Sequence, residues 1–148
     1  LAAIGMAETI HAAARGERIT TVFINNTTYG MTGGQMAPTT LLGQKSTTCP
    51  SGRATDLAGY PIRVCELLST LDGPIYIARV APTNPAGIIK TKNAIKKGFQ
   101  KQLEGRGFSM IEVLCNCPTQ LKLSPIDSLK WVEENMVPYY PLGEFIDR

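Results

Sequence analysis

The sequence contains few of the residues on which several common kinds of site depend. It has one histidine, one tryptophan and four cysteines in 148 residues. The cysteines form no Cys-x-x-Cys pair and have no companion histidine at metal-ligand spacing, so we do not expect a self-contained zinc site. We also do not expect an extracellular disulfide framework in a chain of this composition.

Long apolar runs and a strong net charge are absent as well. No run approaches the roughly 20 apolar residues that a membrane-spanning helix needs, so we expect no membrane partner. The net charge is only +3, and no aromatic residues alternate with basic ones, so we expect no nucleic-acid partner. Hydrophobic residues make up 43% and charged residues 18%, which predicts a packed core, and the length suits a single domain over residues 1–148.

Strand-like and helix-like segments alternate along the chain. The segments predicted as strands are Thr20–Ile24, Pro74–Val80 and Ser109–Leu114, and those predicted as helices are Leu1–Ala14, Pro61–Ser69, Pro85–Gln102 and a last helix from Pro125, with Ser124 as its N-cap and an extended tail after it. This alternation predicts an α/β fold, doubly wound with a largely parallel sheet.

Apolar spacing also predicts which helix faces are buried. The inward residues are expected to be Ile4, Ala7, Ile10 and Ala14 in the first helix, Ile88, Ile89, Ile95 and Phe99 in the long helix, and Leu129, Val132 and Met136 in the last. Lysines 90, 92, 96, 97 and 101 are expected mainly outward. A solvated face is their plain interpretation, and an electrostatic docking site for an acidic partner is the alternative.

One polar stretch follows the first predicted strand directly. It begins with Asn25 and Asn26 and contains three glycines, Gly30, Gly33 and Gly34. Paired asparagines suit the carboxyl end of a parallel strand, where open α/β sheets bind ligands, and glycines let backbone N–H groups approach an anion. No Gly-Lys-Ser/Thr follows, so this is not a Walker A loop, and a metal such as Mg²⁺ would have to supply positive charge. A polar loop with turn glycines is the alternative.

The motif Asn-Asn-x-x-Tyr-Gly-Met-Thr-Gly-Gly-Gln-x-x-Pro-Thr-Thr, from Asn25 to Thr40, resembles the signature of the thiamine-diphosphate-binding β subunit of 2-oxoacid:ferredoxin oxidoreductases. Similar landmarks follow at Gly59–Ile62, Leu71–Pro74, Cys117–Thr119 and Trp131–Gly143. The pattern is most similar to the branched-chain, 2-oxoisovalerate type. The resemblance implies the thiamine-diphosphate-binding fold, with a Gly-Asp-Gly motif just before Leu1 in a longer chain.

The resemblance also implies roles for individual residues. Asn26 would bind Mg²⁺ through its side chain and Thr28 through its backbone carbonyl, while Asn25 would form hydrogen bonds around the site. Met31 would brace the thiazolium ring, with core packing as its plain interpretation. The residues expected to bind the cofactor are Asn25, Asn26, Thr28, Tyr29, Gly30, Met31, Thr32, Gly33, Gly34 and Gln35.

A [4Fe–4S] cluster is implied too, with Cys117 as the one ligand in this sequence. Cys115 is expected to be a small buried side chain, and Cys49 and Cys65 to be structural. No catalytic base is expected here, because the glutamate that activates the cofactor belongs to the partner subunit. Lone His11 is expected at the surface or partly packed, without a catalytic role.

The implied function is CoA-dependent oxidative decarboxylation of a 2-oxoacid in a cytoplasmic complex. Its partners would be the α and γ/δ subunits, ferredoxin, CoA and the 2-oxoacid, and acidic ferredoxin would be the candidate for the lysine face. Pyruvate or 2-oxoglutarate as the substrate, a non-redox thiamine-diphosphate decarboxylase or synthase, and a non-catalytic α/β interaction module are the alternatives. Arg53 and Lys45, in the long stretch from Pro38 to Leu57, could meet a substrate carboxylate or CoA phosphate, or be solvated loop charges.

Overall fold

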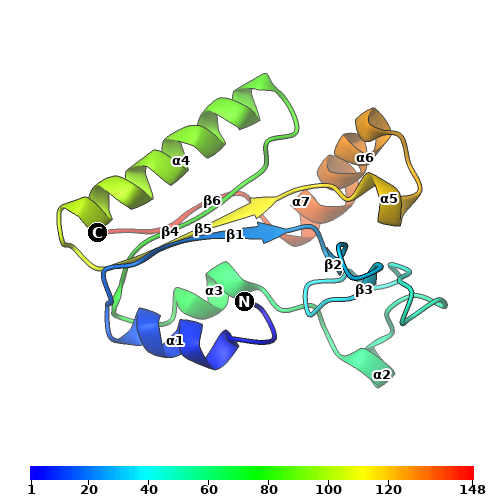
Figure 1. The fold of residues 1–148 in the computed structure, drawn as a ribbon, viewed down its shortest axis with the longest axis horizontal. Helices are drawn as coiled ribbons and strands as arrows, with labels where there is room; N and C mark the ends of the chain where they lie inside the picture. The colour runs from blue at the N-terminus through cyan, green and yellow to red at the C-terminus, as the bar shows by residue number, and fades with distance from the viewer.

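A four-stranded sheet runs through the centre of the computed structural model, which describes residues 1–148 (Figure 1). Its strands, in spatial order, are β1 (Thr20–Asn25), β5 (Phe108–Leu114), β4 (Pro74–Val80) and β6 (Gly143–Asp147). β1, β5 and β4 are parallel, and β6 is antiparallel to β4. The predicted α/β fold with a largely parallel sheet is therefore confirmed, and the tail expected to be extended forms a paired edge strand.

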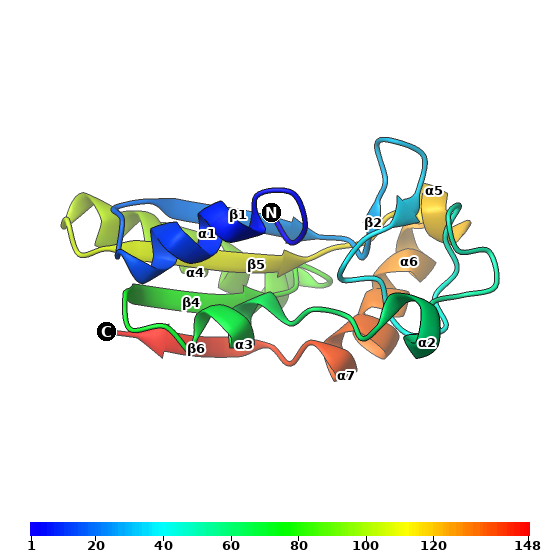
Figure 2. The same ribbon diagram turned by 90° about the horizontal axis from the view of Figure 1, so that it is seen from below.

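Helices cover both faces of this sheet. The long helix α4 (Pro85–Leu103) lies on one face, and α1 (Met6–Ala14) and α3 (Val64–Leu68) lie on the other (Figures 1 and 2). All seven residues of β5 are buried, as expected for a parallel strand covered on both faces. The three predicted strands agree with the observed ones to within one residue.

The first helix begins later than predicted. Gly5 has a left-handed φ of 86°, and the helix starts only at Met6. Ile4 therefore lies outside the helix with 92% of its surface exposed, and Ala13 is the one buried residue of the helix. Of the predicted inward stripe, Ile10 packs against the core as expected, whereas Ile4, Ala7 and Ala14 are exposed, because the helix is shorter and turns a different face to the sheet. His11 is exposed, in line with the surface position expected for it.

The face that α4 buries also differs from the prediction. Ile95 packs against the core as predicted, but Ile88, Ile89 and Phe99 are exposed. The buried residues are Thr91, Ala94, Gly98 and Lys101. A Cβ atom at Gly98 would lie only 2.7 Å from the Ile111 side chain, so the helix backbone approaches the sheet closely. Small side chains face the strands because larger ones would not fit, and apolar spacing alone does not reveal that limit.

The remaining elements gather beyond the carboxyl ends of the parallel strands (Figure 1). They are the hairpin β2 (Thr28–Tyr29) and β3 (Gln35–Met36), the helices α2 (Thr55–Ala58), α5 (Pro118–Leu121), α6 (Pro125–Trp131) and α7 (Val137–Tyr139), and a π-helical turn η1 (Val132–Met136). Ser124 caps α6 as predicted, and Val132 and Met136 are buried as predicted.

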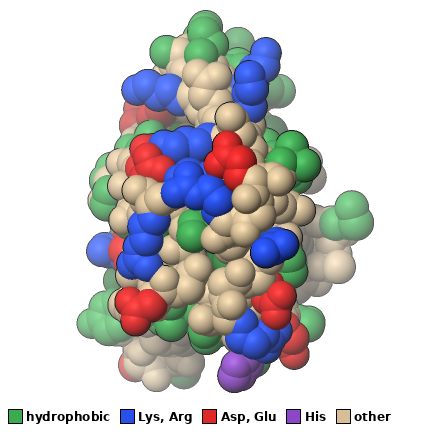
Figure 3. Space-filling view, turned by 90° about the vertical axis from the view of Figure 1, so that its left-hand side faces the viewer, with side chains coloured by type: hydrophobic (Ala, Val, Ile, Leu, Met, Phe, Trp, Pro, Cys, Tyr) green, Lys and Arg blue, Asp and Glu red, His purple; other side chains and the backbone are tan.

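Acidic and basic side chains are intermixed at the opposite end of the molecule (Figure 3). Lys97 pairs with Glu144 and Asp147, and Lys101 pairs with Asp147. These ion pairs tie α4 to β6, so two of the lysines predicted to face solvent instead hold an edge strand, and Lys101 is buried. No helix is both long enough and apolar enough to cross a membrane.

Candidate functional site

The two asparagines at the end of β1 have different environments. Asn25 is almost fully buried, and both ends of its amide are occupied. Its Nδ2 donates to Glu112 Oε1 at 2.7 Å, and its Oδ1 accepts from the Thr27 N–H at 3.0 Å. Because its side-chain oxygen already has a donor, Asn25 is arranged to hold the backbone of the turn.

Asn26 is only half-buried, and its side-chain oxygen is less engaged. Its Oδ1 accepts one hydrogen bond, from the Thr28 N–H at 3.3 Å, which lies at the long end of the range for such bonds. An amide oxygen has two lone pairs, so Asn26 keeps acceptor capacity for a hard cation. The residues present therefore fit Mg²⁺, with the Asn26 side chain and the Thr28 carbonyl as the groups that would hold it.

The glycine-rich segment folds into a hairpin that is braced by its own polar groups. The Gly33 N–H donates to the Gly30 carbonyl and the Gly34 N–H to the Tyr29 carbonyl, while the Thr32 and Gln35 side chains bond to each other. The N–H groups of Gly33 and Gly34 are therefore bonded within the loop. They are not free to bind the anion that the glycines were expected to contact.

Two side chains of this hairpin project outward. Tyr29 is 42% exposed and Met31 is fully exposed. Core packing within this chain, the plain interpretation of Met31, is therefore wrong, and its expected contact with the thiazolium ring stays a prediction.

The segment after β5 meets this hairpin. Cys117 Sγ lies 3.1 Å, and Asn26 Nδ2 3.5 Å, from the point where a Cβ atom would stand on Gly30. A side chain at Gly30 would therefore fit only if Cys117 moved slightly away. Gln120 in α5 packs against Gly34 in the same way. The loops that follow two neighbouring strands thus bring Asn26, Gly30 and Cys117 together.

The two cysteines of the segment after β5 are both partly buried. Burial, and then the neighbouring Cys117, raise the pKa of the Cys115 thiol to about 11, so it remains protonated at neutral pH. No group of three or more histidine, cysteine or acidic side chains in the chain could hold a metal ion. Cys117 could therefore serve a cluster only as one of several ligands, of which these residues do not supply a full set.

Arg53 is neither a solvated charge nor free to bind an anion. It is buried, and its guanidinium donates to six backbone carbonyls, of Ala37, Pro38, Thr40, Ala58, Gly59 and Tyr60. Arg53 was interpreted either as an anion-binding residue or as a solvated charge, and both interpretations were wrong. Its guanidinium N–H groups instead hold together the long stretch that follows the hairpin. Lys45 is exposed, as expected for a solvated loop charge.

Sequence reasoning missed a buried charged pair beneath Asn25. Arg79 in β4 and Glu112 in β5 are fully buried, stand opposite each other in the sheet, and are joined by a 2.8 Å ion pair. Arg79 also binds Glu66 of α3 through two bonds of 3.0 and 2.6 Å. The sequence did contain a signal: each of two mostly apolar predicted strands carries one charged residue, of opposite sign. Charges in such strands are buried only when they are paired.

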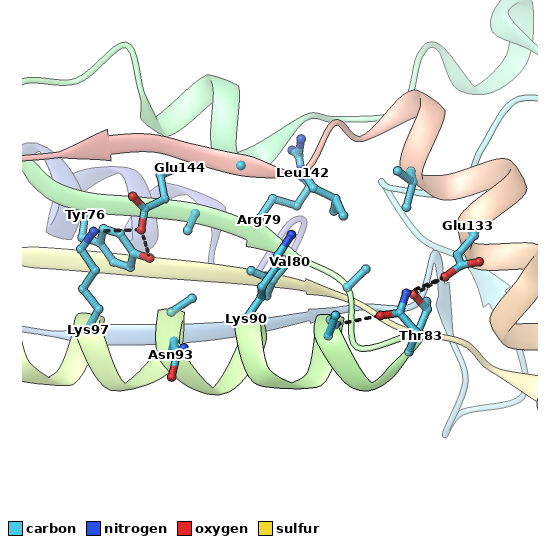
Figure 4. Close-up of a pocket in the computed structure, with 18 residues that line it drawn as sticks. Tyr76, Arg79, Val80, Thr83, Lys90, Asn93, Lys97, Glu133, Leu142 and Glu144 are labelled. Atoms are coloured by element: carbon cyan, nitrogen blue, oxygen red, sulfur yellow. Dashed lines mark hydrogen bonds and ion pairs between the residues drawn. The ribbon is translucent and has the colours of Figure 1, made fainter.

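The protein's larger groove lies away from this site (Figure 4). It has a volume of about 710 Å³ between α4, β4, β6 and η1, and none of the residues from Asn25 to Gln35 lines it. Ion pairs and hydrogen bonds occupy most of its charged groups, among them Lys97 to Glu144 and Thr83 to Glu133, and Lys90 is the exception. A smaller groove of about 410 Å³ lies under the hairpin, lined by Tyr29, Met36 and Arg53 among others.

Known proteins resemble this chain over nearly its whole length. It is 47% identical over 148 residues to the ketoisovalerate oxidoreductase subunit VorA of Methanothermobacter marburgensis, covering all of this chain and 31% of that protein. It is 37% identical over 142 residues to the 2-oxoglutarate synthase subunit KorB of Methanocaldococcus jannaschii, covering 93% of this chain and 48% of that protein. The chain thus spans less than half the length of these relatives.

A solved structure shares the fold. A chain of the 2-oxoglutarate:ferredoxin oxidoreductase from Magnetococcus marinus, with 2-oxoglutarate, coenzyme A and succinyl-CoA bound, superposes with a TM-score of 0.73 at 20% identity, covering 99% of this chain and 53% of that one. The family described as thiamine pyrophosphate enzyme, C-terminal TPP binding domain, matches residues 1–113, which include β1, the hairpin and most of β5. The chain therefore belongs to the thiamine pyrophosphate enzymes, as part of their C-terminal cofactor-binding domain.

Proposed function

We propose that these residues form the magnesium and thiamine-diphosphate site in one subunit of a 2-oxoacid:ferredoxin oxidoreductase. The observation that carries the proposal is the meeting of Asn26, Gly30 and Cys117 beyond the ends of β1 and β5. It is supported by membership of the thiamine pyrophosphate enzymes and by 47% identity to a ketoisovalerate oxidoreductase subunit. Residues 1–148 act as one domain in this proposal.

The bound cofactor supplies a nucleophilic carbon and an electron sink for decarboxylation. The residues of this chain would bind and orient it: Asn26 and the Thr28 carbonyl would hold Mg²⁺, and the exposed Met31 would contact the thiazolium ring. Tyr29, Gly30 and the segment Thr32–Gln35 shape the space around the diphosphate. No general base is assigned to these residues, because that group belongs to the partner subunit.

Cys117 is proposed as one ligand of a [4Fe–4S] cluster that accepts electrons from the cofactor. Its place against Gly30 supports this role, because it puts the thiol beside the residues that hold the diphosphate. The other ligands, the α and γ/δ subunits and ferredoxin complete the cytoplasmic complex. Lys90, Lys92 and Lys96 are exposed on α4 and are the residues available for docking an acidic ferredoxin.

The proposed substrate is 2-oxoisovalerate, converted with CoA to the acyl-CoA and CO₂ while ferredoxin is reduced. The test is anaerobic viologen reduction by the complete native complex with CoA, Mg²⁺ and thiamine diphosphate, comparing 2-oxoisovalerate, pyruvate and 2-oxoglutarate. We expect CoA-dependent reduction that is fastest with 2-oxoisovalerate and lost in Asn26→Ala. Faster turnover of another oxoacid would overturn the substrate only, whereas no reduction by a cofactor-loaded complex would overturn the reaction.

A further inference from the structure

A continuous line of hydrogen bonds leads from the core of the protein to the candidate magnesium loop. Glu66 binds Arg79, Arg79 Nε donates to Glu112 Oε2 at 2.8 Å, and Glu112 Oε1 accepts from Asn25 Nδ2 at 2.7 Å. Arg79 and Glu112 are fully buried. Partial burial opposes the ionisation of Glu66, but hydrogen bonds from Arg79 and from its own backbone, together with the charges of Arg79 and Arg63, hold the pKa of Glu66 below its usual value. The arginine therefore sits between two acidic groups.

The carboxylate of Glu112 fixes which way the Asn25 amide points. An ionised carboxylate only accepts hydrogen bonds, and a guanidinium only donates them. Glu112, paired with Arg79, therefore requires the NH₂ group of Asn25 to face it, and the Asn25 oxygen must face the other way. That oxygen accepts from the Thr27 N–H at 3.0 Å.

Thr27 needs this support because its backbone is in an unfavourable conformation. It has a left-handed φ of 59°, which is a true outlier for a β-branched residue. The Thr27 N–H is held by Asn25, and the Thr27 carbonyl accepts from the Thr40 hydroxyl. Thr27 stands between Asn26 and Thr28, so its conformation sets the direction of both groups proposed to bind Mg²⁺.

We propose that Glu112 is a positioning residue for the magnesium site: its carboxylate, fixed by Arg79, orients Asn25, and Asn25 holds the turn that aims Asn26 and Thr28. The role rests on the proposed function, because it concerns the same magnesium and diphosphate site. In this role Glu112 contacts neither the metal nor the cofactor. Its effect reaches the metal through hydrogen-bond polarity, as that of outer-shell groups generally does.

The first test is Glu112→Gln in the complete native complex, freed of cofactor and titrated calorimetrically with Mg²⁺ at saturating thiamine diphosphate. The glutamine NH₂ group must face either Asn25 Nδ2 or the two donors on the other side, Arg79 Nε and the Cys65 thiol. Facing one neutral amide costs less than facing a guanidinium and a thiol, so we expect the bond to Asn25 to be the one that breaks. We expect the apparent Mg²⁺ affinity to fall at least about tenfold, as for other outer-shell substitutions.

Glu66→Gln is the matched control. It takes a carboxylate away from Arg79, as Glu112→Gln does, but leaves the Asn25 contact intact. We expect it to lower the unfolding temperature while leaving the Mg²⁺ affinity unchanged. An equal loss of affinity in both variants would show that general destabilisation, and not orientation of Asn25, is responsible, and would overturn the proposal.

A reversed pair gives a second test. In Asn25→Asp two carboxylates face each other, and we expect Mg²⁺ affinity to fall. In the double variant Asn25→Asp with Glu112→Gln, the glutamine NH₂ donates to the aspartate while its oxygen accepts from Arg79, and the other aspartate oxygen still accepts from Thr27. We expect the double variant to recover most of the affinity lost in Asn25→Asp.

The outcomes separate this inference from the proposed function. If the unaltered complex does not bind Mg²⁺ and thiamine diphosphate, the proposed function fails. If it binds them and Glu112→Gln binds them equally well, only the role of Glu112 fails. Should Glu112→Gln not fold, the comparison of Asn25→Asp with the double variant decides, and absence of recovery in a folded double variant overturns the role.

Discussion

At the scale of single residues, buried charge organises the parts of the protein that have little regular structure. Arg53 has no carboxylate partner among its hydrogen bonds and binds six backbone carbonyls instead. Planar guanidinium groups present several donors in a fixed geometry, which a lysine cannot reproduce. The stretch from Ala37 to Tyr60 therefore folds around one side chain.

Arg53→Lys is expected to destabilise the protein strongly. A lysine cannot reproduce the spread of the guanidinium donors, and although the Ala37 and Pro38 carbonyls keep backbone donors, each other buried carbonyl left without a donor costs about 1–3 kcal/mol. We expect the free energy of unfolding to fall by about 3 kcal/mol or more, measured by chemical denaturation of the full-length protein. The exposed Lys45→Gln is the control and should change it by less than about 0.5 kcal/mol. Equal stability of Arg53→Lys and the unaltered protein would contradict the structural role of Arg53.

Sequence reasoning about individual residues succeeded where the chemistry is local. Ser124, for example, caps α6 as predicted from the Ser-Pro pair. The hydrogen-bonding role of Asn25, which the resemblance implied, agrees with its contacts to Glu112 and Thr27. Arg53 was misjudged because its acceptors are backbone carbonyls, which every residue has and which no side-chain pattern reveals. Glu112 was missed because its partner Arg79 depends on the register of two strands far apart in the sequence.

At the scale of elements, backbone-to-backbone contacts decide how tightly helices approach the sheet. α1 ends against the turn before β4, where a Cβ atom on Gly73 would lie 2.2 Å from the Ala13 carbonyl oxygen. In α4, a Cβ atom on Gly98 would lie 2.7 Å from the Ile111 side chain of β5. Apolar spacing predicted that these segments are helices, but it found only Ile10 and Ile95 of the packed residues, because small residues mark the closest contacts.

Gly73→Ala is expected to be far more costly than Gly43→Ala. The methyl group of Gly73→Ala would overlap the Ala13 carbonyl oxygen, which we expect to lower the free energy of unfolding by about 3 kcal/mol. Gly43 has a left-handed φ of 74° but open space around it, so alanine there should cost only about 1 kcal/mol. Denaturant unfolding of both variants measures the difference, and equal costs would contradict the close approach of α1 to Gly73.

Ion pairs of the edge strand β6 are expected to make the stability of the folded protein fall in acid. Hydrogen bonds from Lys101 and Lys97 lower the pKa of Asp147 to about 2, from an ordinary value of 3.8. A lowered carboxylate pKa stabilises the folded state above the ordinary value, and this contribution is lost as the pH falls from about 4 to about 2.

Asp147→Asn tests this sensitivity. The variant should be less stable than the unaltered protein near pH 6, and the difference should shrink as the pH falls from about 4 through about 2 and disappear only below that. Unfolding temperatures measured across this pH range check it. If the two proteins differed in unfolding temperature by the same amount at every pH, the ion pairs of Asp147 with Lys97 and Lys101 would contribute nothing to stability.

At the scale of the whole molecule, the fold places its polar segments at one end of a mostly apolar sheet. β1 and β5 are neighbours, and the loops that follow them carry Asn26 and Cys117 to the same place although these residues are distant in sequence. The order of strands and helices could be predicted from the sequence. The sequence does not predict that β1 and β5 are neighbours, because strand order depends on packing across the whole domain. The meeting of the two loops therefore could not be predicted either.

Thiamine-diphosphate binding by the complete native complex tests the central claim most directly. Calorimetric titration of the cofactor-free complex, with and without Mg²⁺, would compare the unaltered protein with Asn26→Ala and with Asn135→Ala, an exposed asparagine on η1. We expect Mg²⁺-dependent binding that is lost, or at least about a hundredfold weaker, only in Asn26→Ala. Binding by Asn26→Ala equal to that of the unaltered protein would contradict the assignment of the magnesium site to the end of β1.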